Sequence, residues 1–273
     1  MALTGLQIQK LLPKTNCKEC GSNTCLAFAM KLAAKKAELS LCPYASDEAK
    51  QVLGAASEPP VKAVALGPDG SVKLGEETVL YRHEKTFVNR TAFGVNIDDN
   101  SPTIDVTLAS IRDYSMVRVG QTLTLDLVAL THKTSTPAAF AALATKAWKT
   151  AGKPLVLKSG SGVSPLGSQA QSRDGSATID AALIAAAVAV KGSRSLLCPA
   201  AAPSDQLLAA ARENGHALAI TAPDLDSLAA LADSLKTAGV ADLILNFQTH
   251  TLAEQFQTNS IARRAALKDS FKP

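Results

Sequence analysis

Four cysteines near the start of the chain form the set of side chains best suited to chemistry. Cys17, Cys20, Cys25 and Cys42 follow the spacing Cys-x2-Cys-x4-Cys-x16-Cys. Four thiolates are the usual ligands of an iron-sulfur cluster, and a cysteine followed directly by proline, as in Cys42-Pro43, also ends a bacterial ferredoxin cluster motif. We therefore predict that these four residues bind one metal centre.

Two alternatives to an iron-sulfur cluster remain open. A structural zinc site with four cysteine ligands usually has two short Cys-x2-Cys pairs, whereas sixteen residues separate Cys25 from Cys42. Disulfides are typical of secreted proteins, and residues 1–16 have neither the apolar core nor the cleavage site of a secretory signal. The pattern favours a cluster over zinc and either over disulfides, and it predicts a cytoplasmic protein.

The third and fourth cysteines can meet only if the chain turns back between them. A straight helix over 25–42 would hold Cys25 and Cys42 roughly 25 Å apart, at about 1.5 Å per residue. We therefore expect a helix from near Thr24 to about Lys36, followed by a reversal. Pro43 prevents a helix from continuing past the last cysteine. The buried face of the expected helix carries Leu26, Ala29, Met30 and Ala33.

Short helices are expected on both sides of the cysteine segment. Thr4 and Gln7 fit a capping box that opens a helix ending at Pro13. Ser46 begins another short helix, and the Ser-Glu-Pro-Pro sequence at 57–60 is typical of a linker. These signals predict a small domain over residues 1–57 and a large domain over residues 58–273.

The large domain alternates strand-like and helical segments. A hairpin is expected over 61–74, around a Gly-Pro-Asp-Gly turn, and a further extended segment over 77–84. Apolar strands are expected at 92–97, 123–130, 154–158, 194–200, 216–222 and 241–247, and helices at 103–116, 137–151, 177–190, 204–214, 224–238 and 251–268. Apolar strands without strict polar alternation are buried on both faces, and their alternation with helices is typical of a parallel sheet.

This alternation fits a TIM-type (β/α) barrel or an open doubly wound sheet. No Gly-x-Gly-x-x-Gly motif follows the first strand, so a dinucleotide site is unsupported. A complete barrel needs about 250 residues, and only six β/α units fit after Thr91. The residues therefore predict an α/β fold, with a small N-terminal α-helical iron-sulfur domain, and the resemblance described below implies that this is a 4Fe-4S domain followed by an incomplete TIM-type (β/α) barrel. A short form completed by another polypeptide and an open six-unit sheet are the alternatives, and the loop at 159–176 is predicted to be disordered.

Polar side chains interrupt three of the apolar strands. Asn96, Asp126 and Asn246 could converge near the C-terminal face of a barrel, where barrel enzymes place their sites. Barrel methyltransferases that act on reduced pterins use Asp and Asn in this manner, so a polar barrel pocket is a hypothesis. A buried hydrogen-bond network without a ligand is the favoured alternative, because buried polar groups need partners.

The remaining ionisable residues have structural interpretations. The Arg-His-Glu-Lys sequence at 82–85 fits local ion pairing at a strand end, which we favour over a docking network. His132 and His250 follow strands and are interpreted as ordinary loop histidines. Cys198, alone in a strand, is interpreted as a small buried hydrophobe.

Composition argues against nucleic-acid and membrane partners. The net charge is +4, and basic residues are neither concentrated on one element nor interleaved with aromatic residues, which make up 4% of the chain. The longest unbroken apolar run is residues 181–190, whereas a membrane-spanning helix needs about 20 apolar residues.

Three segments resemble the family of the large (gamma) subunit of the corrinoid iron-sulfur protein. That protein is a component of the CO dehydrogenase/acetyl-CoA synthase (acetyl-CoA decarbonylase/synthase) complex. The segments are residues 10–44, which contain the four cysteines, residues 77–97, which match the start of the family's barrel, and residues 119–130. They occur in the order found in the family.

The resemblance implies a set of cofactors. Cys17, Cys20, Cys25 and Cys42 would be the ligands of a 4Fe-4S cluster. The family also binds a corrinoid (cobamide) cofactor on a C-terminal domain. We expect that domain to be absent from this chain, which looks truncated within the barrel.

The resemblance also implies a function. The family carries a methyl group between methyl-tetrahydropterin and acetyl-CoA synthase in the reductive acetyl-CoA pathway of carbon fixation, and its cluster reductively reactivates corrinoid cobalt from Co(II) to Co(I). The implied role is a component of a Co-methyltransferase system. The implied partners are the small subunit of the heterodimer, the methyl-tetrahydropterin methyltransferase and acetyl-CoA synthase. Two alternatives are a stand-alone iron-sulfur electron-transfer protein without methyl carriage and a zinc-stabilised pterin-binding methyltransferase.

Overall fold

The chain divides into two compact units, Met1–Lys62 and Ala63–Pro273, which we call the N-terminal and C-terminal units. The computed structural model describes residues 4–33, 37, 39–50, 53, 61–78, 88–160, 176–240, 242–249, 251–268 and 271. The expected domain boundary between 57 and 58, the linker at 57–60, the segment 82–85 and the loop residues 161–175 lie outside the described residues.

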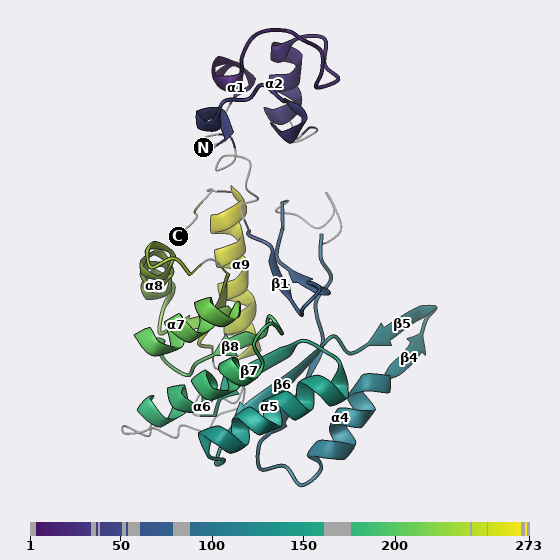
Figure 1. Ribbon diagram of the computed structural model, residues 1–273, viewed down its shortest axis with the longest axis vertical. Helices are drawn as coiled ribbons and strands as arrows, with labels where there is room; N and C mark the ends of the chain where they lie inside the picture. Colours follow the sequence, from purple (N-terminus) through teal and green to yellow (C-terminus); the bar gives the residue numbers. More distant parts are fainter. Residues whose placement is uncertain are drawn as a thin grey trace. The chain divides into compact units, whose positions relative to one another are not determined.

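The N-terminal unit begins with the capping box that the sequence predicts. Helix α1 (Gly5–Leu11) starts where the Thr4 hydroxyl accepts from the Gln7 N–H, while the Gln7 side chain accepts from the Thr4 N–H at 2.8 Å. The helix ends at Leu12, which is extended before Pro13. Helix α2 (Cys25–Ala33) packs against α1, and a short 3-10 turn η1 (Leu39–Leu41) precedes Cys42 (Figure 1).

The buried face of α2 differs from the expected one. Its buried residues are Cys25, Phe28 and Ala29, whereas Leu26 and Met30 are 37% and 56% exposed. The buried stripe is rotated by one residue, because Cys25 faces inward and Phe28 follows it at helical spacing. The expectation that Leu26, Met30 and Ala33 form this face was therefore wrong, and Ala29 alone was right.

The C-terminal unit is built on a six-stranded parallel sheet. Its strands lie in the order β10-β9-β8-β7-β6-β3. Their bounds are β3 (Gly94–Asp98), β6 (Leu127–His132), β7 (Leu155–Ser159), β8 (Leu196–Cys198), β9 (Ala217–Ala222) and β10 (Leu243–Phe247). The connecting helices are α4 (Ile104–Asp113), α5 (Pro137–Ala151), α6 (Ser176–Ala189), α7 (Asp205–Asn214) and α8 (Leu225–Thr237), and α9 (Leu252–Lys268) follows β10. The predicted alternation of strands and helices is confirmed.

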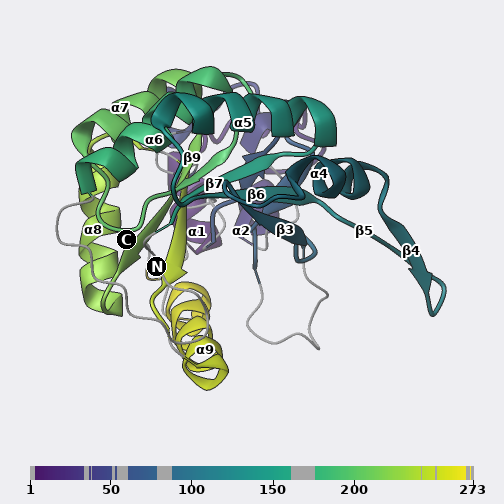
Figure 2. The ribbon, with the colours of Figure 1, turned by 90° about the horizontal axis from the view of Figure 1, so that it is seen from below.

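The strand order distinguishes the two folds that the sequence left open. Each new strand of the sheet is added on the same side of the preceding strand, as in a TIM-type barrel. In a doubly wound sheet the direction in which strands are added reverses once. Figure 2 shows α5, α6, α7 and α8 in an arc along one face of the sheet. Among the described residues β3 and β10 each pair with a single neighbour, so these two strands are the edges of the sheet.

The central strands of the sheet are buried on both faces, as their apolar sequences predict, whereas the edge strands β3 and β10 each carry exposed residues. Leu155 and Leu157 are fully buried in the core beneath the helices. Val156, between them, packs with Leu196 and Ala217 in a second cluster on the opposite face. That cluster includes residues of the predicted N-terminal hairpin, which consists of β1 (Val64–Leu66) and β2 (Val72–Leu74). The hairpin therefore covers part of the sheet face that the helices leave open.

Local signals set the helix ends in this unit. Helix α5 begins with Thr136, whose hydroxyl accepts from the Ala139 N–H, and has Pro137 in its first turn. It ends at Gly152, whose φ of +61° is the left-handed conformation that glycine adopts without a steric penalty. Ser204 and Asp224 cap α7 and α8 in the same way as Thr136 caps α5.

A small antiparallel hairpin was missed by the sequence predictions. The expected helix 103–116 ends early, at Asp113, and the expected strand 123–130 is divided. Between them lie β4 (Ser115–Arg118) and β5 (Gln121–Thr124), joined through Val119 and Gly120 (Figure 1). The missed signal was Gly120 between two short runs of residues that favour strands.

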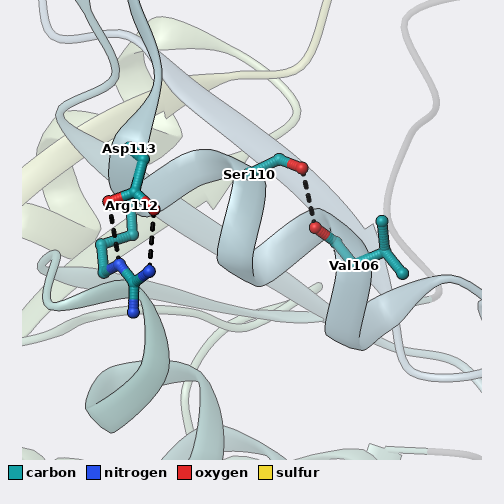
Figure 3. A network of polar contacts seen from close by, with 4 residues as sticks. All are labelled: Val106, Ser110, Arg112 and Asp113. Atoms are coloured by element: carbon teal, nitrogen blue, oxygen red, sulfur yellow. Dashed lines mark hydrogen bonds and ion pairs between the residues drawn. The ribbon is translucent and has the colours of Figure 1, made fainter.

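The last turns of α4 carry two kinds of side-chain contact. The Ser110 hydroxyl donates to the Val106 carbonyl at 2.8 Å, and the Arg112 guanidinium donates to both carboxylate oxygens of Asp113 at 2.9 and 2.8 Å (Figure 3). Arg112 in the last turn is favourable at a helix C-terminus, and its ion pair offsets the unfavourable negative charge of Asp113 there. Tyr114 then takes up extended backbone angles and leads into β4.

We expect buried His216 to make the stability of the C-terminal unit depend on pH. Its Nδ1 accepts from the Ser195 N–H at 3.1 Å, and its Nε2–H donates to the Ala187 carbonyl at 2.9 Å, so the neutral ring fits its site. Burial lowers the pKa of His216 below its ordinary value of 6.5. As the pH falls below 6.5, His216 takes up a proton in the unfolded chain but stays neutral in the folded chain. The free energy of unfolding is therefore expected to fall as the pH decreases from about 6.5, by at most about 1.4 kcal/mol per pH unit.

Urea titration at pH 7.5 and pH 5.5 measures this dependence. The fluorescence of Trp148, the single tryptophan, reports on the C-terminal unit because its side chain packs against that core. His216→Gln should reduce the difference in stability between the two pH values, whereas the control His132→Gln should retain it. An unchanged difference in His216→Gln would contradict the assignment.

Candidate metal centre

The four cysteines occupy four different structural positions in the N-terminal unit. Cys17 lies in the loop after α1, Cys20 in the following turn, Cys25 at the first position of α2, and Cys42 directly after η1. Cys17 is exposed and Cys20 is half-buried, whereas Cys25 and Cys42 are each only 7% exposed. All four are free thiols and so remain available as ligands.

An apolar cluster surrounds the two buried cysteines. Cys25 and Cys42 belong to the core of the N-terminal unit, and Cys20 packs against it. The other buried members of this core are Ile8, Leu12, Phe28, Ala29, Ala45, Ala49 and Leu53. Burial on one side and exposure at Cys17 on the other are two of the features that set the potential of an iron-sulfur centre.

The loop that carries Cys17 has an unusual backbone. Lys14, Asn16 and Lys18 have φ values of +58°, +50° and +68°, and Gly21 follows at +71°. A non-glycine residue in this left-handed region costs about 1–3 kcal/mol and tends to occur at functional sites. Alternation of left-handed with other residues is also typical of the backbone concavities that hold anions and Fe–S clusters.

Three side-chain hydrogen bonds tie the cysteine segments together. The Asn16 Oδ1 accepts from the Cys25 N–H at 2.8 Å. The Lys31 ammonium donates to the hydroxyl of buried Ser22 at 3.1 Å. The Tyr44 hydroxyl donates to the Glu19 carboxylate at 3.0 Å, and this hydrogen bond raises the pKa of Tyr44. The sequence predictions missed all three hydrogen bonds, although every residue in them lies within six positions of a cysteine.

The residues of the hypothetical barrel pocket are not brought together. Asn96 in β3 accepts from the Thr131 hydroxyl and lines a polar pocket with Asp98 and Ser101. Asp126 lies just before β6, not inside a strand as expected, and lines a different pocket. Asn246 lies on β10, at the opposite edge of the sheet from β3.

Asp126 has a structural partner for each carboxylate oxygen. It forms an ion pair with Arg90 and accepts from the Phe93 N–H at 2.9 Å. Its side chain is 12% exposed. These contacts fix the chain just before β3, which agrees with the favoured alternative of a hydrogen-bond network at this residue.

The remaining candidate residues are three histidines and Cys198, and the structure describes only some of them. His83 and His250 lie outside the described residues. His132 packs edge-on against Phe140, with the ring centroids 5.2 Å apart, and its Nε2 lies 2.8 Å from the Ser135 carbonyl. Burial raises the pKa of the Cys198 thiol to about 12, so at neutral pH it is a protonated thiol and not a thiolate ligand.

The C-terminal unit matches a known family. Residues 63–273 match the model described as CO dehydrogenase/acetyl-CoA synthase delta subunit. The chain belongs to this family. Residues 12–44, which contain all four cysteines of the predicted site, match a second model, described as "Putative Fe-S cluster".

Relatives from this complex match along the chain. It is 35% identical over 277 residues to the corrinoid/iron-sulfur protein large subunit of Moorella thermoacetica, covering 100% of the chain and 58% of the relative. It is 30% identical over 278 residues to the acetyl-CoA decarbonylase/synthase complex subunit gamma of Methanothermobacter thermautotrophicus, covering 98% and 56%. The chain thus spans somewhat more than half the length of these relatives. The resemblance found in the sequence is confirmed.

Four free thiols, two of them buried, have the donor chemistry of an iron-sulfur cluster. A zinc ion needs four sulfur atoms at about 2.3 Å. Within the part of the chain that the structure describes, no three His, Cys, Asp or Glu side chains are grouped closely enough to hold one metal ion. In a 4Fe-4S cluster each thiolate binds a different iron, so its ligands lie farther apart.

Among the described helices, none combines the length and the hydropathy that crossing a bilayer requires.

Proposed function

We propose that the N-terminal unit binds a 4Fe-4S cluster through Cys17, Cys20, Cys25 and Cys42. The observation that carries this proposal is that Cys25 and Cys42 are buried in one small apolar core and Cys20 packs against it, while Cys17 is exposed in the preceding loop. The match of residues 12–44 to an Fe-S model supports it. A domain of about 60 residues is marginally stable without such a centre, so the ligands also contribute to folding.

The proposed cluster would supply one-electron chemistry when bound. Cys25 and Cys42 would hold it against the apolar core, and Cys17 would leave one side open to an electron donor or acceptor. Thiolate ligation and partial exposure allow a low potential, which reduction of corrinoid cobalt from Co(II) to Co(I) demands. Ligation needs reduced thiolates, which supports a cytoplasmic location.

We propose that the chain serves in a corrinoid iron-sulfur protein. In this role it would take part in methyl carriage between a methyl-tetrahydropterin methyltransferase and acetyl-CoA synthase, paired with a small subunit. The names of the relatives from Moorella and Methanothermobacter support this assignment. The sheet of the C-terminal unit would act as the scaffold of the complex.

A second candidate is a stand-alone iron-sulfur electron-transfer protein. The observation that favours it is that all four cysteines lie within residues 12–44, the segment that matches the Fe-S model, and none is needed from the C-terminal unit. In this case methyl carriage would not involve these residues.

Metal analysis separates the two candidates. The full chain would be produced anaerobically together with a small subunit and a cobamide source, and iron, sulfide, cobalt and zinc would be measured in the purified product. Iron together with cobalt supports methyl carriage, and iron without cobalt supports the electron-transfer candidate. Zinc without iron would contradict the cluster itself.

A further inference from the structure

We propose that Asn16 is a positioning residue, which holds the loop with the first cysteine, Cys17, at the start of the helix with the third cysteine, Cys25. This inference rests on the proposed cluster. Asn16 directly precedes Cys17, and its Oδ1 accepts from the backbone N–H of Cys25 at 2.8 Å. One hydrogen bond thus links the residue next to the first cysteine, Cys17, to the backbone of the third cysteine, Cys25.

The Asn16 Oδ1 accepts from an N–H group that has no partner within its own helix. Cys25 is the first residue of α2, and the first N–H groups of a helix have no partner within it. The Thr24 hydroxyl accepts from the Ala27 N–H at 3.0 Å, which leaves the Cys25 N–H to Asn16. Since Cys25 is only 7% exposed, an unpaired N–H at this position would be costly.

The backbone of Asn16 also fits this role. Its φ of +50° places it in the left-handed region, which asparagine tolerates better than other non-glycine residues. This conformation reverses the chain locally, so that the side chain can reach α2 while the next residue, Cys17, stays exposed. The residue type therefore satisfies a backbone requirement and a hydrogen-bond requirement at once.

Removing a hydrogen-bond partner that orients a metal ligand typically lowers the affinity for the metal about 10–100-fold. We expect Asn16→Ala to lose its cluster to an iron chelator about tenfold faster than the unmodified chain. Asn16→Gly keeps the left-handed backbone but removes the hydrogen bond, and it should lose the cluster as fast as Asn16→Ala. Asn16→Asp keeps an acceptor oxygen and should stay close to the unmodified chain.

The experiment follows the fall in absorbance near ~400 nm after a chelator is added to the anaerobically reconstituted full chain. Asn23→Ala, an exposed asparagine in the same cysteine segment, serves as the matched control. Circular dichroism of each variant before reconstitution separates loss of helix from loss of ligand positioning. The predicted order is a slow loss in the unmodified chain, Asn16→Asp and Asn23→Ala, and a fast loss in Asn16→Ala and Asn16→Gly with unchanged helix content.

Several outcomes would overturn the inference. An Asn16→Ala variant that keeps its cluster as long as the unmodified chain would show that the contact is dispensable. A slow loss in Asn16→Gly would show that the backbone conformation matters and the hydrogen bond does not. Reduced helix content in both variants would assign Asn16 to folding. An unmodified chain that forms no cluster would instead refute the proposed function, so the two failures are distinguishable.

Discussion

Cys20→Ala is expected to abolish the broad absorbance near ~400 nm that a 4Fe-4S cluster gives. Cys20 is half-buried and packs against the apolar core that contains Cys25 and Cys42. Alanine cannot bind iron, so one corner of the cluster would lose its protein ligand and bound iron should fall well below about four per chain. The measurements are the absorption spectrum and the iron content after anaerobic reconstitution.

Cys198→Ala is the matched control for that substitution. Cys198 belongs to the C-terminal unit, on β8, and burial raises the pKa of its thiol to about 12. Its removal should leave the spectrum and the iron content unchanged. Equal losses in the two variants would contradict the assignment of ligands, because they would show that the spectrum depends on Cys198 as much as on Cys20.

Phe28→Ala is expected to unfold the N-terminal unit when no cluster is bound. Phe28 is 1% exposed and is the largest fully buried side chain of the apolar core around Cys25 and Cys42. Deleting a buried phenylalanine side chain costs about 3–5 kcal/mol, which is comparable to the whole stability of a domain of about 60 residues. Far-ultraviolet circular dichroism and limited proteolysis of the cluster-free protein would detect the loss, and the yield of reconstituted cluster should fall with it.

Two comparisons make this test specific. Leu6→Ala shortens a side chain on α1 that is 62% exposed and should leave the N-terminal unit folded. The urea transition reported by Trp148 should be the same in Phe28→Ala as in the unmodified chain, because Trp148 packs against the separate core of the C-terminal unit. A protease-resistant N-terminal unit in Phe28→Ala would contradict the account of how this unit is held together.

Local sequence signals predicted the features that depend on neighbouring residues. The capping box at Thr4 and Gln7, the hairpin around Gly67 and Gly70 and the alternation of strands and helices were all found, because each depends on a few consecutive side chains. The absence of polar alternation in the strands also predicted burial on both faces. The strand order, which selects the barrel-type wall over a doubly wound sheet, needed the structure.

The features that depend on distant contacts were missed. The buried face of α2 is set by Cys25 turning inward, a tertiary effect that overrides the pattern of Leu26 and Met30. The hydrogen bond from the Cys25 N–H to Asn16 depends on a left-handed backbone that no local motif signals. The polar strand residues Asn96 and Asn246 share an apolar context but lie on opposite edges of the sheet.

The most direct test of the central claim is the iron and acid-labile sulfide content of the anaerobically purified full chain, together with its electron paramagnetic resonance spectrum after reduction with dithionite. Binding by Cys17, Cys20, Cys25 and Cys42 predicts about four irons and about four sulfides per chain, with a signal from a reduced cluster. A chain that holds one zinc ion, no sulfide and no such signal would contradict the claim.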